Sequence, residues 1–432
     1  MKFLSVIPNQ SKQAIGILSI GTFLEYFDFM LYIHMAILLN EIFFPKTSPE
    51  TEALLASLTF CSTYLLRPLG AIIFGYIGDN IGRKATVIIT TFMMALSCLV
   101  MANLPTYSQI GIVATWLVIC CRIIQGLSAM GEIMGANIYL TETIKPPYRN
   151  SIVASLEIFC ELGALCALGV AALATGYGLN WRYAFWVGAI IGLLGFTART
   201  RLKETSEFVN AKKRLANKLI DLNQNPELLN NNIIIQEKVS YKLLLSYFII
   251  SGFFAIRLYL TYMFCGSILK TQFNFTSAEV ITQNFFVSLV NIFHVVTLVF
   301  LSYRVHPLRI LKYKFYIFSV FLCLFPYLLT QLQNSYQLFV IQCIIEVFMP
   351  TVFPAGVILL KNLPVFRRFT YACLMHALSR TVMSILISFG LVSLIASYGY
   401  YSIYVILLPL IIAFYFARSY YEKLERAAGD YY

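Results

Sequence analysis

The stretch "GTFLEYFDFMLYIHM", residues 21–35, belongs to an apolar run that extends from about residue 14 to residue 39. A helix of about 20 apolar residues crosses the hydrocarbon core of a bilayer, so the run has the length of a membrane span. It also contains Glu25, Asp28 and His34. Ionisable side chains inside a span are costly unless they face protein or a water-filled cavity. The stretch therefore predicts a membrane helix with a polar interior face.

Similar apolar runs recur along the whole chain. They lie near residues 14–39, 53–77, 86–104, 109–140, 151–175, 181–198, 241–266, 278–302, 313–330, 336–360, 370–395 and 400–417. Of the 432 residues, 59% are hydrophobic and 12% are charged, whereas soluble domains contain about 25% charged residues. Membrane β-strands would show short alternating patterns instead. The sequence thus predicts an all-α membrane protein with twelve transmembrane helices in two six-helix bundles.

One long hydrophilic segment, from Arg199 to Lys238, separates the twelve spans into six and six. We expect an N-terminal bundle over 1–198, a cytoplasmic linker loop over 199–240, a C-terminal bundle over 241–418 and a cytoplasmic tail over 419–432. Within the linker, residues 204–222 predict an amphipathic surface helix, and the Asn-rich part over 223–232 predicts a flexible segment. Two membrane halves joined in this way are typical of transporters whose substrate site lies near the midplane between them.

The net charge of +12 follows the positions of the basic residues along the chain. With both termini in the cytoplasm, 25 of the 32 Lys and Arg residues fall on the cytoplasmic side and only Lys46, Arg182 and Lys270 fall outside. This is the positive-inside distribution. It predicts a multi-pass plasma-membrane protein with both termini cytoplasmic, and it explains the basic surplus without nucleic-acid binding.

The loop after the second span reads "GYIGDNIGRK", residues 75–84. Its glycines permit a tight turn and a close helix approach, and its acid complements the positive N-terminal end of a neighbouring helix while it pairs with a basic side chain. We interpret the loop as a gate element rather than a substrate site; the alternative is an ordinary charged loop. The gate motif consists of Gly75, Gly78, Asp79, Gly82, Arg83 and Lys84.

This loop resembles the GxxxDxxGRK signature of the major facilitator superfamily. Three further stretches resemble patterns of its metabolite:proton symporters, which include proline/betaine, α-ketoglutarate, shikimate and citrate carriers. They are "LEYFDFMLY" (24–32), "LRPLGAIIFGYIGD" (66–79) and "RIIQGLSAMGEIMGANIYLTE" (122–142). The resemblance implies a twelve-helix fold, proton-coupled symport by alternating access and a bacterial inner-membrane location.

Helical spacing of about 100° per residue places Glu25, Asp28, Phe29 and Tyr32 on one stripe of the first span. The stripe should face the protein interior, where its acids bind either a proton or the cationic part of a substrate. The alternative is a structural ion pair with an intramembrane arginine. Because aromatic faces attract quaternary ammonium groups, Phe29 and Tyr32 favour a betaine-like zwitterion. His34 lies off the stripe and is interpreted as structural.

Further charged residues inside the other spans complete the predicted site. Glu157 and Glu161 repeat at i+4, away from the small-residue face of their helix, and so predict a cavity lining. Arg122 belongs to the matched fourth-span motif and is a candidate clamp for a substrate carboxylate or a partner in proton coupling. Arg257 and Arg380 are the corresponding candidates from the second half.

The sequence favours transport driven by an ion gradient. It has no GxxxxGK[ST] loop for ATP and no metal-binding motif, so we expect no cofactor and no metal, with the proton gradient as the driving force. The predicted function is proton-coupled import of a small zwitterionic osmolyte or amino acid by a monomer. An organic-acid symporter, an exporter and a non-transporting membrane receptor remain the alternatives.

Overall fold

The computed structural model describes residues 9–43, 65–176, 180–221 and 239–431, and all regular structure in these ranges is helical. The first half contains α2 (Asn9–Phe43), α4 (Arg67–Asn80), α5 (Arg83–Asn103), α6 (Tyr107–Ile110), α7 (Ile112–Thr143), α8 (Arg149–Gly176) and α9 (Arg182–Arg199). The linker contains α10 (Ser206–Asp221). The second half contains α12 (Tyr241–Leu258), η1 (Tyr259–Phe264), α13 (Cys265–Phe273), α14 (Ser277–Arg304), α15 (Pro307–Thr330), α16 (Ser335–Phe348), α17 (Gly356–Lys361), η2 (Val365–Arg367), α18 (Arg368–Ile385), η3 (Leu386–Gly390), α19 (Leu391–Tyr398), η4 (Tyr400–Ser402) and α20 (Ile403–Ala427).

The all-α prediction is confirmed, and a described helix lies at each predicted span. In the described ranges, nine helical segments are long and apolar enough to cross a membrane. The three other predicted spans contain the shorter helices α4, α9 and α16. Residues 53–64 of the predicted span over 53–77 lie outside the described residues, as does the Asn-rich segment over 223–232.

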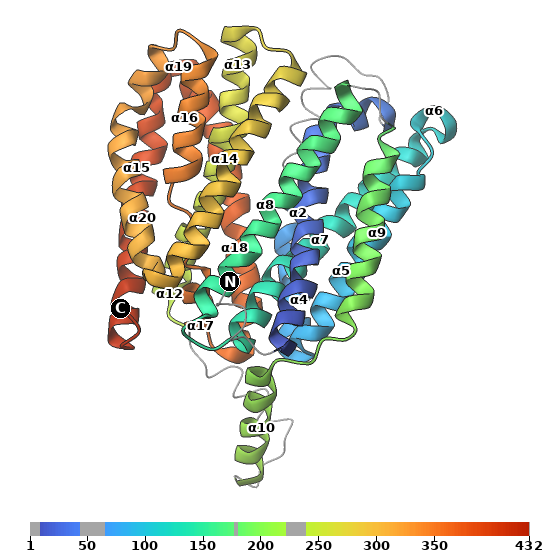
Figure 1. Ribbon diagram of the computed structural model, residues 1–432, viewed down its shortest axis with the longest axis vertical. Coiled ribbons are helices and arrows are strands. Elements are labelled where there is room, and N and C mark those ends of the chain that lie inside the picture. The colour runs from blue at the N-terminus through green and yellow to red at the C-terminus, as the bar shows by residue number, and fades with distance from the viewer. Residues whose placement is uncertain (1–8, 44–64, 177–179, 222–238, 432) are drawn as a thin grey trace.

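The helices form two groups that lie side by side (Figure 1). In the first group, α2 packs on α7, α8 and α9, and α5 packs on α7 and α9. In the second group, α12 packs on α18 and α20, and α16 packs on α14 and α15. The two groups meet where α8 packs on α14 and where α4 packs on α18. Both contacts bring together segments that are far apart in the chain.

Large apolar side chains cover the outer surface of both groups. Trp116 is 62% exposed, and Phe293 and Phe300 are each 73% exposed. A soluble protein rarely exposes large contiguous apolar patches. In a bilayer the same side chains contact lipid, so the exposed surface fits a membrane-spanning bundle.

The predicted span over 336–360 is not one continuous helix, which corrects the sequence prediction. α16 ends at Phe348, and helix resumes only at Gly356 in α17. The intervening "MPTVFPA" contains Pro350 and Pro354. Proline lacks the backbone N–H and clashes with the preceding helical turn, so the helix breaks here. Irregular backbone inside a membrane protein persists only where it is buried in protein or lines a cavity.

α10 projects away from the bundle at the lower end in Figure 1. We call this the α10 end. The helix covers Ser206–Asp221, which confirms a helix in the linker part over 204–222. Its first two turns contact the bundle, because Phe208 is buried and the Lys212 ammonium donates to the carbonyl of Asn80 over 3.1 Å.

Candidate functional site

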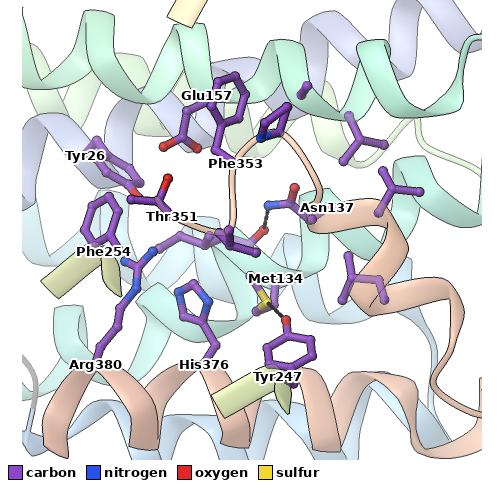
Figure 2. A pocket seen from close by; sticks show the side chains of 18 residues that line it. Tyr26, Met134, Asn137, Glu157, Tyr247, Phe254, Thr351, Phe353, His376 and Arg380 are labelled. Carbon is purple, nitrogen blue, oxygen red and sulfur yellow. Dashed lines mark hydrogen bonds between the residues drawn. The ribbon is translucent and has the colours of Figure 1, made fainter. Parts of the chain in front are cut away.

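A cavity lies at the interface between the two groups of helices, and Figure 2 shows it from close by. Its volume is about 680 Å³, including the space that is open to solvent. The walls come from α2, α7 and α8 of the first half and from α12, α17, α18 and the 349–355 break of the second half. Thr351, Val352, Phe353 and Pro354 of the break line it. The broken helix thus has the cavity-lining position that its irregular backbone requires.

Two opposite charges reach this interface cavity from opposite halves. Glu157 lines it from α8 and Arg380 lines it from α18. In Figure 2 the Glu157 carboxylate and the Arg380 guanidinium point toward the same space. No cation of the described chain lies within 4.0 Å of the Glu157 carboxylate. A small molecule with separated positive and negative groups would find a complementary charge on each wall.

Aromatic side chains form much of the remaining lining. The Arg380 guanidinium lies over the ring of Phe254, with 3.8 Å between its central carbon and the ring centroid. The rings of Tyr26 and Phe254 meet edge to face, with centroids 6.4 Å apart. Tyr247 donates a hydrogen bond to the sulfur of Met134 over 3.8 Å. These faces and edges provide contacts for a cation or for apolar ring atoms.

His376 stands one helical turn before Arg380 and lines the same cavity. Only 3% of the residue is exposed. Its Nε2 atom has no hydrogen-bond partner among the described residues. A buried polar atom without a partner is uncommon in folded proteins, so His376 is an available donor or acceptor for a bound molecule.

A second cavity, of about 380 Å³ including the space that is open to solvent, adjoins Tyr26 and Phe254. Both aromatic residues line both cavities, so the pair forms a partition between them. The second cavity contains Glu161, Arg257 and Glu346. Arg257 forms ion pairs with both carboxylates. We call these three residues the Arg257 cluster.

The two acids of the opening stretch are buried in ion pairs within the first half. Glu25 accepts from Arg67 over 3.2 Å, and Asp28 pairs with Arg122 over 3.3 Å. Gln125 supports the second pair, since its side-chain nitrogen donates to Asp28 over 2.8 Å and its oxygen accepts from Arg122 over 2.6 Å. The acids are therefore sequestered by arginines of α4 and α7.

The aromatic members of the predicted stripe lie against the same arginines. The Phe29 ring centroid is 4.8 Å from the central guanidinium carbon of Arg67, and that of Tyr32 is 3.6 Å from that of Arg122. Neither of the two cavities described above has Glu25, Asp28, Phe29, Tyr32 or Arg122 in its lining. The residue of this span that reaches both cavities is Tyr26.

Sequence reasoning thus identified part of the cavity linings. Of the predicted residues, Glu157, Glu161, Arg257 and Arg380 line one cavity or the other. It missed a set of aromatic and polar residues that share the linings: Tyr26, Asn137, Tyr247, Phe254, Thr351 and His376. Two of them carry a usable signal, because Phe254 precedes Arg257 by three residues and His376 precedes Arg380 by four, which places each pair on one helix face.

The gate motif lies at the α10 end, where α4 meets α18. The Asp79 carboxylate accepts hydrogen bonds from the backbone N–H groups of Phe369 and Thr370 over 3.0 and 2.8 Å. It also pairs with Arg83 over 3.4 Å. Thr370 is in turn close to Gly75, where an added Cβ atom would lie 2.8 Å from the Cα atom of Thr370. Gly75 thus permits the close approach of α4 and α18.

A buried network extends from this contact. The Arg83 guanidinium pairs with Glu142 of α7 over 3.0 Å and donates to the carbonyl of Val365 over 2.6 Å. Glu142 also pairs with Arg368 over 3.0 Å. We call the contacts of Asp79, Arg83, Glu142 and Arg368 the gate network. It joins α4, α5 and α7 to the start of α18.

The linker contributes to the gate network as well. Glu204 accepts from the backbone N–H groups of Arg83 and Lys84 over 3.1 and 3.3 Å. Glu207 of α10 pairs with Arg368 over 3.0 Å. These contacts hold the start of the linker against both halves. In the described ranges there is no group of three or more His, Cys, Asp and Glu side chains that could hold a metal ion.

Comparison with known proteins identifies related sequences and folds. The sequence profile of the Major Facilitator Superfamily matches residues 18–355. A "Putative proline/betaine transporter" of Staphylococcus aureus (strain COL) is 31% identical over 260 residues, which are 58% of this chain and 54% of the relative. The "Proline/betaine transporter" of Escherichia coli (strain K12) is 33% identical over 204 residues, which are 46% of this chain and 41% of the relative. The chain spans about half the length of the curated relatives that it matches.

Solved structures share the fold over almost the whole chain. The proton:xylose symporter XylE bound to 6-bromo-6-deoxy-D-glucose matches with a TM-score of 0.71 at 16% identity, over 96% of this chain and 95% of that protein. The human organic anion transporter MFSD10 matches with a TM-score of 0.66 at 16% identity, over 95% of this chain and 100% of that protein. With residues 18–355 of its 432 inside the family profile, the chain belongs to the Major Facilitator Superfamily of secondary transporters.

Proposed function

We propose that this transporter imports a small zwitterion of the proline or betaine type together with a proton, by alternating access. The observation that supports this most directly is the pair of opposite charges, Glu157 and Arg380, on facing walls of the interface cavity. A substrate carboxylate would pair with the Arg380 guanidinium in a two-pronged contact. The substrate cation would lie near Glu157 and the faces of Tyr26 and Phe254. The names of the Staphylococcus aureus and Escherichia coli relatives agree with this choice.

Proton coupling is proposed for the acids of the opening stretch. Asp28 is buried against a single arginine, Arg122, whose guanidinium also contacts Gln125 and the ring of Tyr32. A proton on Asp28 would cancel the ion pair, and Arg122 would keep its two other contacts. Glu25 is paired with Arg67 in the same way, and the Arg67 guanidinium also contacts the ring of Phe29. Either acid could therefore bind and release a proton while its arginine keeps other contacts in the protein.

The proposed topology follows the basic residues. The α10 end would face the cytoplasm of a bacterial cell, with both termini on that side and the chain in the inner membrane. Residues 1–198 and 241–418 would move as the two bundles, 199–240 would be the linker and 419–432 the tail. We propose that the protein works as a monomer, because the interface cavity is built within one chain.

The gate network would close the cytoplasmic side in the conformation described above. Opening that side requires α4 to leave the first turn of α18, which breaks the hydrogen bonds from Phe369 and Thr370 to Asp79. It also separates Arg368 from Glu142. These contacts fit the role of Asp79 and Arg83 as gate residues. Gly75 and Gly78 would allow the close approach of α18, Gly82 would allow the turn beside Glu204, and Lys84 is half-buried.

An organic-acid symporter is the second candidate. Arg380 and the unpartnered Nε2 atom of His376 lie in the same wall of the interface cavity, which suits a carboxylate. Glu157 on the facing wall disfavours a second carboxylate unless that acid is protonated. The zwitterion is the better match for this reason.

Uptake into liposomes tests the proposal. The protein is reconstituted, and labelled proline, glycine betaine, α-ketoglutarate and citrate are offered with and without an inward proton gradient. With the gradient, we expect one of the zwitterions to accumulate in the liposomes. Without the gradient, we expect only the exchange of labelled for unlabelled substrate. Preferential uptake of a carboxylic acid would favour the second candidate. Binding without exchange of any substrate would indicate a receptor, and gradient-driven efflux an exporter. Empty liposomes and the Glu279→Gln variant, which changes an exposed acid at the start of α14, are the controls.

A further inference from the structure

The Arg257 cluster connects the two halves of the transporter. Glu161 comes from α8 of the first half, whereas Arg257 and Glu346 come from α12 and α16 of the second half. Arg257 Nη2 is 3.5 Å from Glu161 Oε1, and Arg257 Nη1 forms a closer ion pair with Glu346 Oε1. One guanidinium thus has one partner in its own half and one in the other half. The contact to Glu161 is an ion pair between the halves.

The charges within these three residues do not balance when both acids are ionised. One arginine faces two carboxylates, and the exposed fractions are only 7% for Glu161, 8% for Arg257 and 1% for Glu346. A buried charge without compensation is costly. The Arg257–Glu346 pair is neutral by itself, so Glu161 carries the surplus negative charge. A proton on Glu161 neutralises the cluster.

Further buried polar groups lie at the same place. The side chain of Asn291 of α14 is fully buried beside Glu161. The Oε2 atom of Glu346 has no hydrogen-bond partner among the described residues. Buried polar atoms in folded proteins are nearly always hydrogen-bonded. The adjoining cavity provides room for the carboxyl group of Glu161 to change its contacts, and these polar groups provide hydrogen-bond partners for it.

Other titratable groups surround Glu161 and its partner Arg257. Glu157 and Cys160 lie on the same helix as Glu161, and Tyr26 of α2 and Tyr262 of η1 line the same cavity. His294 of α14 and Lys314 of α15 lie near Arg257. Lys314 is the one further amine in this set. Within the described residues no carboxylate lies within 4.0 Å of its ammonium, so it does not replace Arg257 as the partner of Glu161.

We propose that Glu161 is a proton-binding site, and that its protonation releases Arg257 and so breaks the ion pair between the two halves. A proton from the aqueous phase binds a carboxylate oxygen of Glu161, which becomes neutral and loses its attraction for Arg257. Arg257 keeps its charge and its pair with Glu346, so the separation leaves no uncompensated arginine. When the cavity opens to the other side, the proton returns to water and the ion pair re-forms. The inference rests on the proposed function only in taking the halves to move against each other.

A first test needs no substrate. Hydrogen–deuterium exchange is followed by mass spectrometry on protein in nanodiscs across about pH 5 to 8, with rates corrected for the intrinsic effect of pH on amide exchange. In the wild type, we expect the facing segments of α8 and α14 to exchange faster as the pH falls. Glu161→Gln should show the faster exchange at every pH, and Glu161→Asp should restore the pH dependence. A wild-type pH response that persists in Glu161→Gln would overturn the proposal.

Glu346→Gln is the matched variant on the other side of Arg257. Without Glu346, Glu161 is the remaining carboxylate for Arg257 and its negative charge is fully compensated. The pH response should then shift to lower pH instead of disappearing. If Glu346→Gln abolishes the response and Glu161→Gln preserves it, the proton is held by Glu346 and the assignment is wrong. Loss of the response in Lys314→Gln, with retention in Glu161→Gln, would transfer it to the lysine.

A second test uses transport. The ratio of gradient-driven accumulation to counterflow should fall at least about tenfold in Glu161→Gln, within the usual range of coupling between linked sites. A ratio equal to that of the wild type would contradict the role of Glu161 in coupling. If the wild type transports none of the offered substrates, the proposed substrate class fails, whereas the exchange experiment still tests Glu161. The two failures are therefore distinguishable.

Discussion

The carboxylate of Asp79 accepts a hydrogen bond from the backbone N–H of Phe369 over 3.0 Å, although 290 residues separate the two in the chain. Phe369 is in the first turn of α18, which begins at Arg368. The N-terminal amides of a helix have no partner within the helix and carry partial positive charge. An acid of one half therefore caps a helix of the other half.

Replacing Asp79 by Asn tests the charge of this cap. The substituted amide would keep the shape of the side chain but lose the negative charge, and hydrogen bonds to charged groups are worth about 1.5–3 kcal/mol against about 1 kcal/mol for neutral ones. We expect faster hydrogen exchange in the first turns of α18 in Asp79→Asn. The Asp430→Asn variant changes an acid of the tail that pairs with Lys361 of α17, and it is the control. Unchanged exchange in α18 would show that the charge does not hold the contact.

The close approach at Gly75 gives a steric prediction. An added Cβ atom would lie 2.8 Å from the Cα atom of Thr370, which is backbone and cannot move aside without shifting a helix. Gly75→Ala should therefore force α4 and α18 apart and increase the labelling of Cys373, which is buried in α18 one turn after Phe369, by a water-soluble thiol reagent. Gly169→Ala is the matched control, because nothing lies within 4 Å of a Cβ atom there. Equal labelling of both variants would contradict the steric argument.

The stability of the protein should depend strongly on whether both members of the Glu25–Arg67 pair are present. Both residues are only 2% exposed. Removing one member of a buried ion pair typically costs about 3–5 kcal/mol, whereas replacing both is often nearly neutral. Arg67→Met should lower the melting temperature in detergent, and the double variant Glu25→Gln/Arg67→Met should recover most of the loss. Additive losses in the double variant would show that the two side chains act independently.

Arg380 should matter for substrates that carry a carboxylate. Arg380→Lys keeps the positive charge but loses the two-pronged geometry and the flat contact with Phe254. We expect the KM for a zwitterionic substrate to rise about tenfold or more, which corresponds to about 1.4 kcal/mol. Arg201→Lys, at an exposed position after α9, should leave the KM unchanged. A KM that Arg380→Lys does not alter would place substrate recognition elsewhere.

The fold was accessible from the sequence because it depends on local patterns. Apolar runs of sufficient length mark the spans, and each has a described helix at its position. The break between α16 and α17 was missed, even though Pro350 and Pro354 are visible in the sequence. The mean hydropathy of that run does not register a missing N–H group, and the cavity that tolerates the break is a property of the assembled helices.

The candidate site was accessible only in part, because partners are chosen by tertiary packing. The sequence left open an ion pair between the acids of the first span and an intramembrane arginine, yet it contained no sign that Glu25 of α2 would pair with Arg67 of α4. Tyr26 and Phe254 were missed for a different reason. Aromatic residues make up 15% of the chain, so composition does not distinguish two rings in a partition from the many that contact lipid.

That partition has a consequence for how signals pass through the protein. Tyr26 belongs to one half and Phe254 to the other, and their rings meet where the two cavities adjoin. Arg380 lies over the Phe254 ring from the first cavity, and Arg257 is 5.2 Å from the same ring centroid in the second. A molecule that displaces the Arg380 guanidinium would therefore act on a ring that also lies near Arg257. Cargo and driving ion would then be coupled through the Phe254 ring, with no long relay of side chains between them.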